Sequence, residues 1–156
     1  MPKVAVGGTF QHFHDGHAKL IEKAFKIAED GKVYIGLTSD EMLNKSHRID
    51  NYDKRRIQLL QYMKKMGFPA EKYEITKLND PYGSTLEDDF DFIIVSPETY
   101  PVALKINSIR KENGKKPLEI VYVEYVMADD GIPISSTRIA KGEIDRHGRL
   151  KKRIKQ

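Results

Sequence analysis

Short apolar runs alternate with segments of helical period along most of this chain, and this alternation restricts the possible folds more than any other feature. The runs are rich in β-branched and aromatic residues. Several are continuously hydrophobic, which is typical of parallel strands covered on both faces. Strands joined by helices through right-handed crossovers form a doubly wound sheet. We therefore predict an α/β fold, a single Rossmann-like, doubly wound domain with about five parallel strands, at residues 3–6, 33–37, 73–78, 92–95 and 119–123.

Four segments outside these runs have the spacing of amphipathic helices. We expect helices that begin near Asp15, that cover residues 53–65, that run from Pro101 to Gly114, and that begin near Ser135. The side chains expected to face the sheet include Leu20, Ile21, Ala24, Ile57, Leu60, Met63, Ala103, Ile106 and Ile109.

The composition is that of a globular domain. With 156 residues the chain is long enough for one domain with a core and too short for two. No apolar run approaches the ~18 residues of a membrane span, and the first residues lack the apolar stretch and cleavage site of a signal peptide. Cysteine is absent, which excludes disulfides and thiolate metal sites. We expect a cytoplasmic protein with no membrane partner.

The positive charge gathers at one end of the chain. The formal net charge is +4, yet residues 141–156 alone contain seven Lys or Arg and two Asp or Glu. A nucleic-acid binder usually carries a basic stripe across a folded face. Here the excess lies in a segment with little to bury. We therefore expect a domain of residues 1–143, a basic and flexible tail of residues 144–156, and no nucleic-acid partner.

The loop after the first predicted strand carries the most chemical information. From Gly7 to His17 it reads Gly-Gly-Thr-Phe-Gln-His-Phe-His-Asp-Gly-His. Glycines after a strand let backbone N–H groups approach an anion, and a helix that begins near Asp15 directs its positive end to the same space. His14 and His17 are three residues apart and can face one ligand. We predict a phosphate site; packed histidines or a metal pair are the alternatives, but no third and fourth metal ligands are evident nearby.

Two further segments are ambiguous when each is taken alone. Residues 135–138, Ser-Ser-Thr-Arg, are more often a helix cap, but together with the histidine loop their hydroxyls, N–H groups and guanidinium suit the β- and γ-phosphates of a nucleotide. Residues 80–83, Asp-Pro-Tyr-Gly, form a plain turn by default.

These motifs, in this order, resemble those of the HxGH nucleotidyltransferase superfamily. Gly-Thr-Phe with HxGH occupies residues 8–17, and the Ser-Ser-Thr-Arg motif lies near the C-terminus. Within the superfamily, the chain is similar to the archaeal and eukaryotic type of phosphopantetheine adenylyltransferases over about residues 3–143. This closer resemblance is carried by residues 42–45, 51–55, 80–83, 95–100, 106–107 and 134–139.

The resemblance implies an enzyme of coenzyme A synthesis. Such an enzyme transfers AMP from ATP to 4′-phosphopantetheine, giving dephospho-coenzyme A and pyrophosphate. Magnesium would accompany ATP, and coenzyme A itself is a further candidate ligand. We expect a monomer or small homo-oligomer and no metal held by protein side chains alone.

The same resemblance assigns roles to residues of this chain. The catalytic residues would be Thr9, His17, Lys45 and Arg138. ATP would be bound by Gly8, Thr9, Phe10, His14, His17, Ser135, Ser136, Thr137 and Arg138. Thr9, Lys45, Arg55 and Tyr82 would bind the acceptor, with Lys45, Arg48 and Arg55 as rival cations for its phosphate.

One position departs from the family pattern. Gln11 follows Gly-Thr-Phe, where the family usually has Asp, so that a hydrogen-bonding group remains and a negative charge is lost. If that residue holds magnesium or orients a ligand, activity is affected. The alternatives are another HxGH nucleotidyltransferase, such as a glycerol-phosphate cytidylyltransferase or a mononucleotide adenylyltransferase, or a catalytically inactive nucleotide-binding module.

Overall fold

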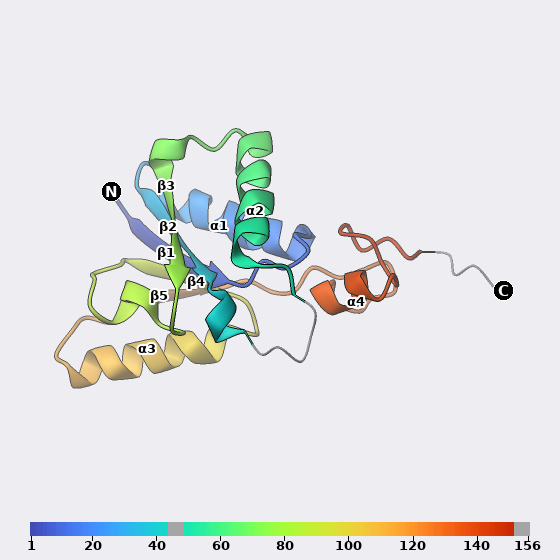
Figure 1. The fold of residues 1–156 in the computed structure, drawn as a ribbon. Coiled ribbons are helices and arrows are strands. Elements are labelled where there is room, and N and C mark those ends of the chain that lie inside the picture. Colours follow the sequence, from blue (N-terminus) through green and yellow to red (C-terminus); the bar gives the residue numbers. More distant parts are fainter. Residues whose placement is uncertain (44–48, 152–156) are drawn as a thin grey trace.

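The alternating pattern folds into a three-layer domain (Figure 1). The computed structural model describes residues 1–43 and 49–151. In chain order the strands and helices are β1 (Lys3–Gly8), α1 (Asp15–Ala28), β2 (Lys32–Thr38), α2 (Tyr52–Met66), β3 (Tyr73–Leu78), β4 (Phe92–Val95), α3 (Tyr100–Glu112), β5 (Glu119–Tyr122) and α4 (Ser136–Ala140). Short 3-10 turns at Asp40–Met42, Ala70–Lys72 and Gly83–Leu86 complete the connections. Within the described residues, no helix has the length and apolar character required to span a membrane.

The five strands form one parallel sheet in the order β3-β2-β1-β4-β5. The chain leaves β1 for β2 and β3 on one side and later returns to β4 and β5 on the other. The strand order therefore reverses between β1 and β4. Open sheets of this kind bind ligands at the carboxyl ends of the strands beside that point. The prediction of a doubly wound α/β domain with five parallel strands is confirmed.

Alternate residues of each strand enter different cores, because side chains of a strand point to opposite faces. Val4 and Val6 face α1 and α2, whereas Ala5 between them belongs to the cluster under α3. β4 divides in the same way, with Ile94 on the first face and Ile93 on the second. Both faces of the sheet are covered, which explains the continuously hydrophobic runs.

The inward face of α2 differs from the prediction. Ile57 is 53% exposed, whereas Leu59 is completely buried. The buried face is formed by Arg55, Leu59 and Met63, which lie four residues apart and so on one side of the helix. Arg55 occupies the inward position one turn before Leu59. The observed buried face of α2 is therefore rotated from the face predicted from its hydrophobic residues.

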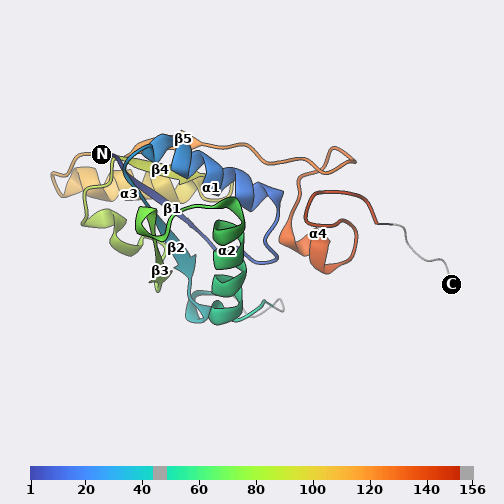
Figure 2. The same cartoon turned by 90° about the horizontal axis from the view of Figure 1, so that it is seen from above.

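The segment after β5 extends past the carboxyl ends of the strands and carries α4 (Figure 2). It has a small core of its own, made of Ala128, Ile134 and Ile144. Ile144 is completely buried and pairs with Leu150 across an antiparallel bridge. The predicted domain boundary at residue 143 stays a prediction, but the segment expected to be a tail begins with a buried residue, Ile144, which packs into this small core.

Candidate active site

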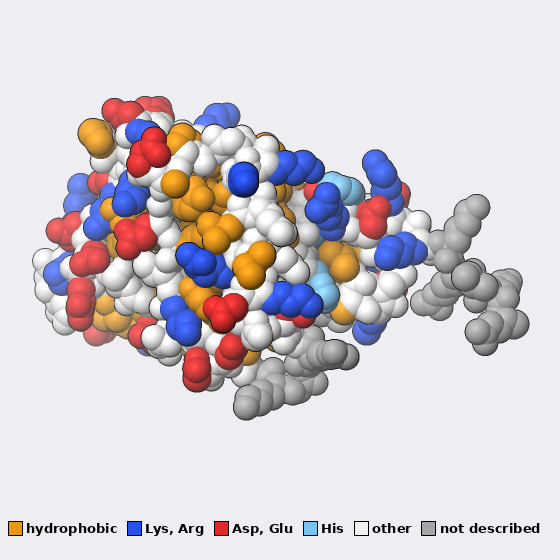
Figure 3. Space-filling view, turned by 45° about the horizontal axis from the view of Figure 1, so that its top comes forward, with side chains coloured by type: hydrophobic (Ala, Val, Ile, Leu, Met, Phe, Trp, Pro, Cys, Tyr) orange, Lys and Arg blue, Asp and Glu red, His pale blue; other side chains and the backbone are white. Residues whose placement is uncertain are grey.

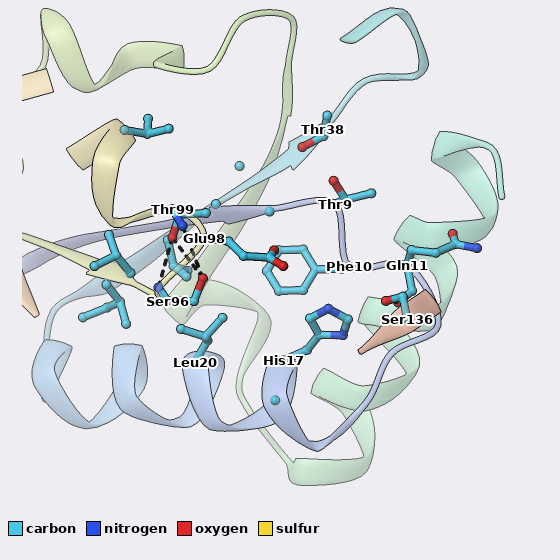
Figure 4. A pocket seen from close by; sticks show the side chains of 18 of the residues that line it. Thr9, Phe10, Gln11, His17, Leu20, Thr38, Ser96, Glu98, Thr99 and Ser136 are labelled. Atoms are coloured by element: carbon cyan, nitrogen blue, oxygen red, sulfur yellow. Dashed lines mark hydrogen bonds between the residues drawn. The ribbon is translucent and has the colours of Figure 1, made fainter. Parts of the chain in front are cut away.

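A cavity of about 1030 Å³ opens at the carboxyl ends of β1 and β4 (Figure 4). Its walls come from the loop after β1, the first turn of α1, residues 81–85, the start of α3 and residues 123–141. This is the position that the strand order indicates for a ligand. The volume is at the upper end of the range for small-molecule and cofactor sites, so the cavity can hold a nucleotide together with a second substrate.

The loop after β1 has a tightly constrained backbone. Phe10 has a φ of 51° and His12 a φ of 45°, both in the left-handed region that side chains other than glycine rarely adopt. Phe10 is also 2% exposed. Such conformations persist where surrounding contacts determine them, and they are concentrated at functional sites. Three side-chain contacts, from Arg55, Gln11 and Ser136, hold this loop.

Arg55 fixes the loop from α2. Its guanidinium is completely buried and donates to the carbonyl of Thr9 at 3.0 Å and to the carbonyl of Asp50 at 2.9 Å. It also forms an ion pair of 3.1 Å with Asp40. Arg55 does not line the cavity. The expectation that Arg55 binds the acceptor phosphate is therefore not supported, because its donors already have partners inside the protein.

Gln11 and Ser136 fix the other end of the loop. Gln11 is 7% exposed, and its side-chain oxygen accepts a hydrogen bond of 3.1 Å from the backbone N–H of Asp50. The hydroxyl of Ser136 donates to the backbone carbonyl of Gln11, and the two residues lie side by side in Figure 4. Gln11 is the residue that departs from the family pattern. It connects the loop after β1 to Asp50, just before α2, and to Ser136 of α4, and each contact involves uncharged groups.

His14 and His17 lie at the start of α1. The ring centroids are 3.7 Å apart and the planes are inclined by 20°, so the imidazoles are stacked. Gly16 makes this possible: a Cβ atom there would lie 2.8 Å from Cε1 of His14. The glycine of the HxGH motif is thus required by the close approach of the first imidazole to the backbone.

The hydrogen bonds of the two imidazoles determine which nitrogen carries the proton. Nδ1 of His14 accepts from the N–H of Gly16 at 3.0 Å, and Nδ1 of His17 accepts from the N–H of His14 at 3.1 Å. A neutral imidazole that accepts at Nδ1 must carry its proton on Nε2. Each ring therefore has an Nε2–H donor, and Figure 4 shows His17 pointing into the cavity beside Phe10.

Both imidazoles are neutral at physiological pH. Burial lowers the pKa of His14 to about 4, with a smaller lowering by His12 and an opposing effect of Asp15. Burial, followed by the neighbouring His14, lowers the pKa of His17 to about 2. Desolvation dominates because it penalises the charged form. The pair offers hydrogen-bond donors to an anion without a net positive charge.

The predicted C-terminal motif reaches the same cavity. Residues 135–138 all line it, but several of their polar groups have partners within the protein. Ser135 caps α4 by accepting from the N–H of Arg138 at 3.2 Å. Arg138 bonds Glu143 through Nε at 3.0 Å and Asp130 through both terminal nitrogens.

Most of the other residues predicted to bind ATP or the acceptor also lie at the cavity. Gly8, Thr9, Phe10 and Tyr82 line the cavity. Asp80 accepts from the N–H groups of Tyr82 and Gly83 at 2.8 Å and 2.9 Å, which forms a tight turn and directs this segment to the cavity wall. Lys45 and Arg48 lie outside the described residues. The structure thus brings the two motifs and Tyr82 to one cavity and leaves out Arg55.

Several lining residues were not predicted from the sequence. Among them are Tyr34, Glu124, Tyr125 and Lys141. Of these four residues, only Lys141 could have been predicted from the sequence, because it lies four residues after Thr137 and so on the same face of a helix. The others belong to strands and to an irregular segment without a recognisable motif.

Known proteins match nearly the whole chain. Residues 5–142 match the family model described as Cytidylyltransferase-like. A protein of Methanosarcina barkeri named phosphopantetheine adenylyltransferase is 83% identical over 155 residues, which are 99% of this chain and 96% of that protein. A protein of the same name from Archaeoglobus fulgidus is 49% identical over 148 residues, 94% of this chain and 97% of that protein. The crystal structure of a protein of unknown function from Archaeoglobus fulgidus has a TM-score of 0.70 at 44% identity, covering 78% of this chain and 88% of that one.

Proposed function

The chain belongs to the cytidylyltransferase-like family and, within it, to the phosphopantetheine adenylyltransferases, and on this basis we propose that it transfers the adenylyl group of ATP to the phosphate of 4′-phosphopantetheine. A phosphate oxygen of the acceptor forms a bond to the α-phosphorus of ATP. The bond from that phosphorus to the bridging oxygen breaks, and pyrophosphate leaves with the electron pair. The products are dephospho-coenzyme A and pyrophosphate, so the enzyme acts in coenzyme A synthesis.

The observation that carries this proposal is the pair of neutral imidazoles at the switch point of the sheet. The acceptor phosphate is already ionised, and the reaction therefore needs no general base. Catalysis depends on alignment of the two substrates and on stabilisation of charge that develops around the α-phosphorus. The Nε2–H of His17 is a fixed donor for that charge, and the Nε2–H of His14 is a second donor for the phosphates of ATP.

The constrained loop supplies the alignment. Thr9 and Phe10 line the cavity between the sheet and α1. We assign Thr9 to the incoming phosphate and the backbone of Gly8 and Phe10 to the phosphates of ATP. Because Arg55 and Ser136 hold this loop on both sides of Phe10, little reorganisation is needed when the substrates bind.

We place the acceptor arm along the wall formed by Pro81, Tyr82 and Thr85, which line the cavity on the side of β3 and α3. The tyrosine ring offers an apolar face for the pantetheine chain and a hydroxyl for its amides. Lys45 stays a prediction for the acceptor phosphate. Coenzyme A, which shares this arm with the product, is a further candidate ligand for the same wall.

Magnesium is proposed to accompany the triphosphate. Within the described residues there is no group of three His, Cys, Asp or Glu that could hold a metal ion, although Glu98 and Glu124 line the cavity. Magnesium in nucleotide sites takes most of its ligands from phosphates and water. When bound, the ion would offset the charge of the phosphates, with at most one or two carboxylates of the protein near it.

The test is pyrophosphate release from ATP and 4′-phosphopantetheine, measured for the wild type and for His17→Ala. Loss of a donor to the transition state should lower kcat by about a hundredfold or more, ~3 kcal/mol. Glycerol phosphate and nicotinamide mononucleotide with ATP or CTP serve as control substrates. Turnover of one of these in place of phosphopantetheine would overturn the proposed acceptor. Undiminished turnover by a folded His17→Ala variant would overturn the role of His17.

A further inference from the structure

Residues 79–89, between β3 and β4, carry the wall to which we assign the acceptor arm. Pro81, Tyr82 and Thr85, together called the acceptor wall, line the cavity from this segment. None of the residues 79–89, all of which the structure describes, is buried. Only Tyr82 and Leu86 pack, partly exposed, against the cluster under α3. Burial of apolar side chains therefore contributes little to the position of this segment, and hydrogen bonds must contribute more.

The first hydrogen bonds of the segment are local. The carboxylate of Asp80 accepts from the N–H groups of Tyr82 and Gly83. The hydroxyl of Thr85 donates to the carbonyl of Tyr82. These contacts close the turn, but they join residues of the same segment and do not attach it to the rest of the domain.

Arg110 attaches the segment to α3. Its Nη1 donates to the carbonyl of Thr85 at 2.9 Å and to the carbonyl of Asp88 at 2.8 Å. Its Nε donates to the carbonyl of Lys116 at 2.8 Å. The side chain is 1% exposed and lies on the buried face of α3, one turn after Ile106. Because Arg110 does not line the cavity, it supports the acceptor wall from behind.

The ion pair of Arg110 contributes less than these contacts to carbonyls. Nη2 lies 3.0 Å from the carboxylate of Asp89, whose side chain is 88% exposed. Exposed carboxylates gain little from such pairs. Figure 3 shows acidic and basic side chains mixed over most of the face that it draws. The buried contacts differ, since a carbonyl or a guanidinium that loses its partner there stays unsatisfied.

Arg110 has a counterpart on the other side of the sheet. Arg55 of α2 is also completely buried, donates to the carbonyl of Thr9 in the loop after β1, and does not line the cavity. The two helices cover opposite faces of the sheet. The loop that we assign to ATP and the acceptor wall are therefore held by different arginines, and the two can be disturbed separately.

We propose that Arg110 is a positioning residue for the acceptor: it holds the acceptor wall in the shape that receives the pantetheine arm, and so sets the affinity for phosphopantetheine independently of the affinity for ATP. This inference rests on the proposed function. Without Arg110, the arm would have to order Tyr82 and Thr85 as it binds, and this ordering lowers the affinity.

Calorimetric titration of phosphopantetheine and of ATP, each alone, tests the assignment. For Arg110→Met, the Kd for phosphopantetheine should rise roughly tenfold, and the Kd for ATP should stay within about twofold of the wild-type value. In steady-state kinetics the KM for phosphopantetheine should rise, whereas kcat at saturating substrate changes only a few-fold. If both Kd values change by the same factor, or neither changes, the assignment is overturned.

Two control variants separate this role from general effects. Met63→Ala removes a completely buried side chain of α2 outside the cavity lining. It should lower the melting temperature and leave the ratio of the two Kd values unchanged. Asp89→Asn removes the ion pair but no contact to a carbonyl, and it should also preserve the ratio. A change of the ratio in either control as large as that in Arg110→Met would overturn the assignment.

Hydrogen exchange tests the wall without any ligand. In Arg110→Met the amides of residues 83–88 should exchange faster than in the wild type, and those of residues 8–17 should exchange at the wild-type rate. Unchanged exchange in residues 83–88 would overturn the role of Arg110. If Arg110→Met does not fold, Arg110→Lys serves in its place. One ammonium group cannot replace a guanidinium that reaches three carbonyls, so the Kd for phosphopantetheine should still rise several-fold.

The titrations distinguish this inference from the proposed function. If the wild type adenylylates phosphopantetheine but Arg110→Met keeps the wild-type ratio, the function stands and the role of Arg110 fails. If the wild type binds phosphopantetheine without turnover and Arg110→Met alters the ratio, the function fails and the role of Arg110 stands. If the wild type does not bind phosphopantetheine, both fail.

Discussion

The Nη1 atom of Arg55 donates a hydrogen bond of 3.0 Å to the backbone carbonyl of Thr9. A completely buried side chain of α2 therefore holds the residue next to Phe10, whose φ of 51° is unfavourable in isolation. The backbone of the loop after β1 is therefore held by an arginine that does not itself line the cavity.

We expect Arg55→Met to lower the free energy of unfolding by roughly 2–4 kcal/mol, because the carbonyls of Thr9 and Asp50 lose a buried donor. It should also lower kcat at saturating substrate by at least tenfold, since the loop loses its fixed geometry. Urea unfolding and steady-state kinetics measure the two effects. Arg110→Met is the matched control.

Arg110 is 1% exposed and bonds the carbonyls of Thr85, Asp88 and Lys116, all outside the loop after β1. Its replacement should cost similar stability and change kcat at saturating substrate only a few-fold, although the KM for phosphopantetheine should rise because Thr85 belongs to the proposed acceptor wall. If both variants lose kcat to the same extent, the effect reflects general destabilisation and Arg55 has no specific role in the loop.

The low pKa values of His14 and His17 predict a dependence of stability on pH. Unfolded histidine has a pKa near 6.5, whereas in the folded protein these values are about 4 and about 2. Below pH 6.5 the unfolded chain therefore binds more protons than the folded one. The contribution to stability is complete above pH 6.5 and decreases as the pH falls, at up to about 1.4 kcal/mol per pH unit for each histidine.

Urea unfolding between pH 7.5 and pH 5 measures this slope. We expect His17→Asn to have a smaller slope than the wild type over the same range, because one of the two protons taken up on unfolding is lost. A variant with the slope of the wild type would show that the pKa of His17 is not lowered on folding, and would contradict the assignment of a neutral imidazole with its proton on Nε2.

Much of the fold was predictable because the signals are local. The strands at residues 73–78 and 92–95 were predicted at their observed bounds, since the first is rich in β-branched and aromatic residues and the second is a short apolar run. The switch point followed from the order of strands and helices, and it placed the cavity correctly at the end of β1. His14, His17 and residues 135–138 could be found because their spacing is itself the motif.

The errors concern residues whose role depends on distant partners. Arg55 was predicted to bind the acceptor phosphate, because no local pattern indicates that the carbonyls of Thr9 and Asp50 surround it. Likewise Ser136 and Gln11 are 125 positions apart. In the basic C-terminal segment, one apolar residue among many charges was too weak a signal to indicate a core.

Gln11 is expected to act on stability through its contact with Asp50. Gln11→Met keeps the volume and removes the oxygen that accepts the Asp50 N–H, so a buried donor is left without a partner at a cost of about 1–3 kcal/mol. Gln61→Met, on the exposed face of α2, should change stability by less than about 0.5 kcal/mol. Equal effects in urea unfolding would show that the hydrogen bond of Gln11 contributes nothing.

The segment after α4 returns to the first turn of α1, which carries His17. Ile144 and Leu150 face each other across a bridge, yet Ile144 is completely buried and Leu150 is 54% exposed. Ile144→Ala should therefore cost about 2–5 kcal/mol, whereas Leu150→Ala should cost little. The carbonyl of Arg146 accepts from the N–H of Asp15 at 3.0 Å, so this segment also touches the first turn of α1. For that reason Ile144→Ala should weaken ATP binding at a temperature at which the variant is still folded, and Leu150→Ala should not. Calorimetric titration of both variants measures their affinity for ATP. Equal affinities would show that the packing of Ile144 has no effect on the ATP site at His14 and His17.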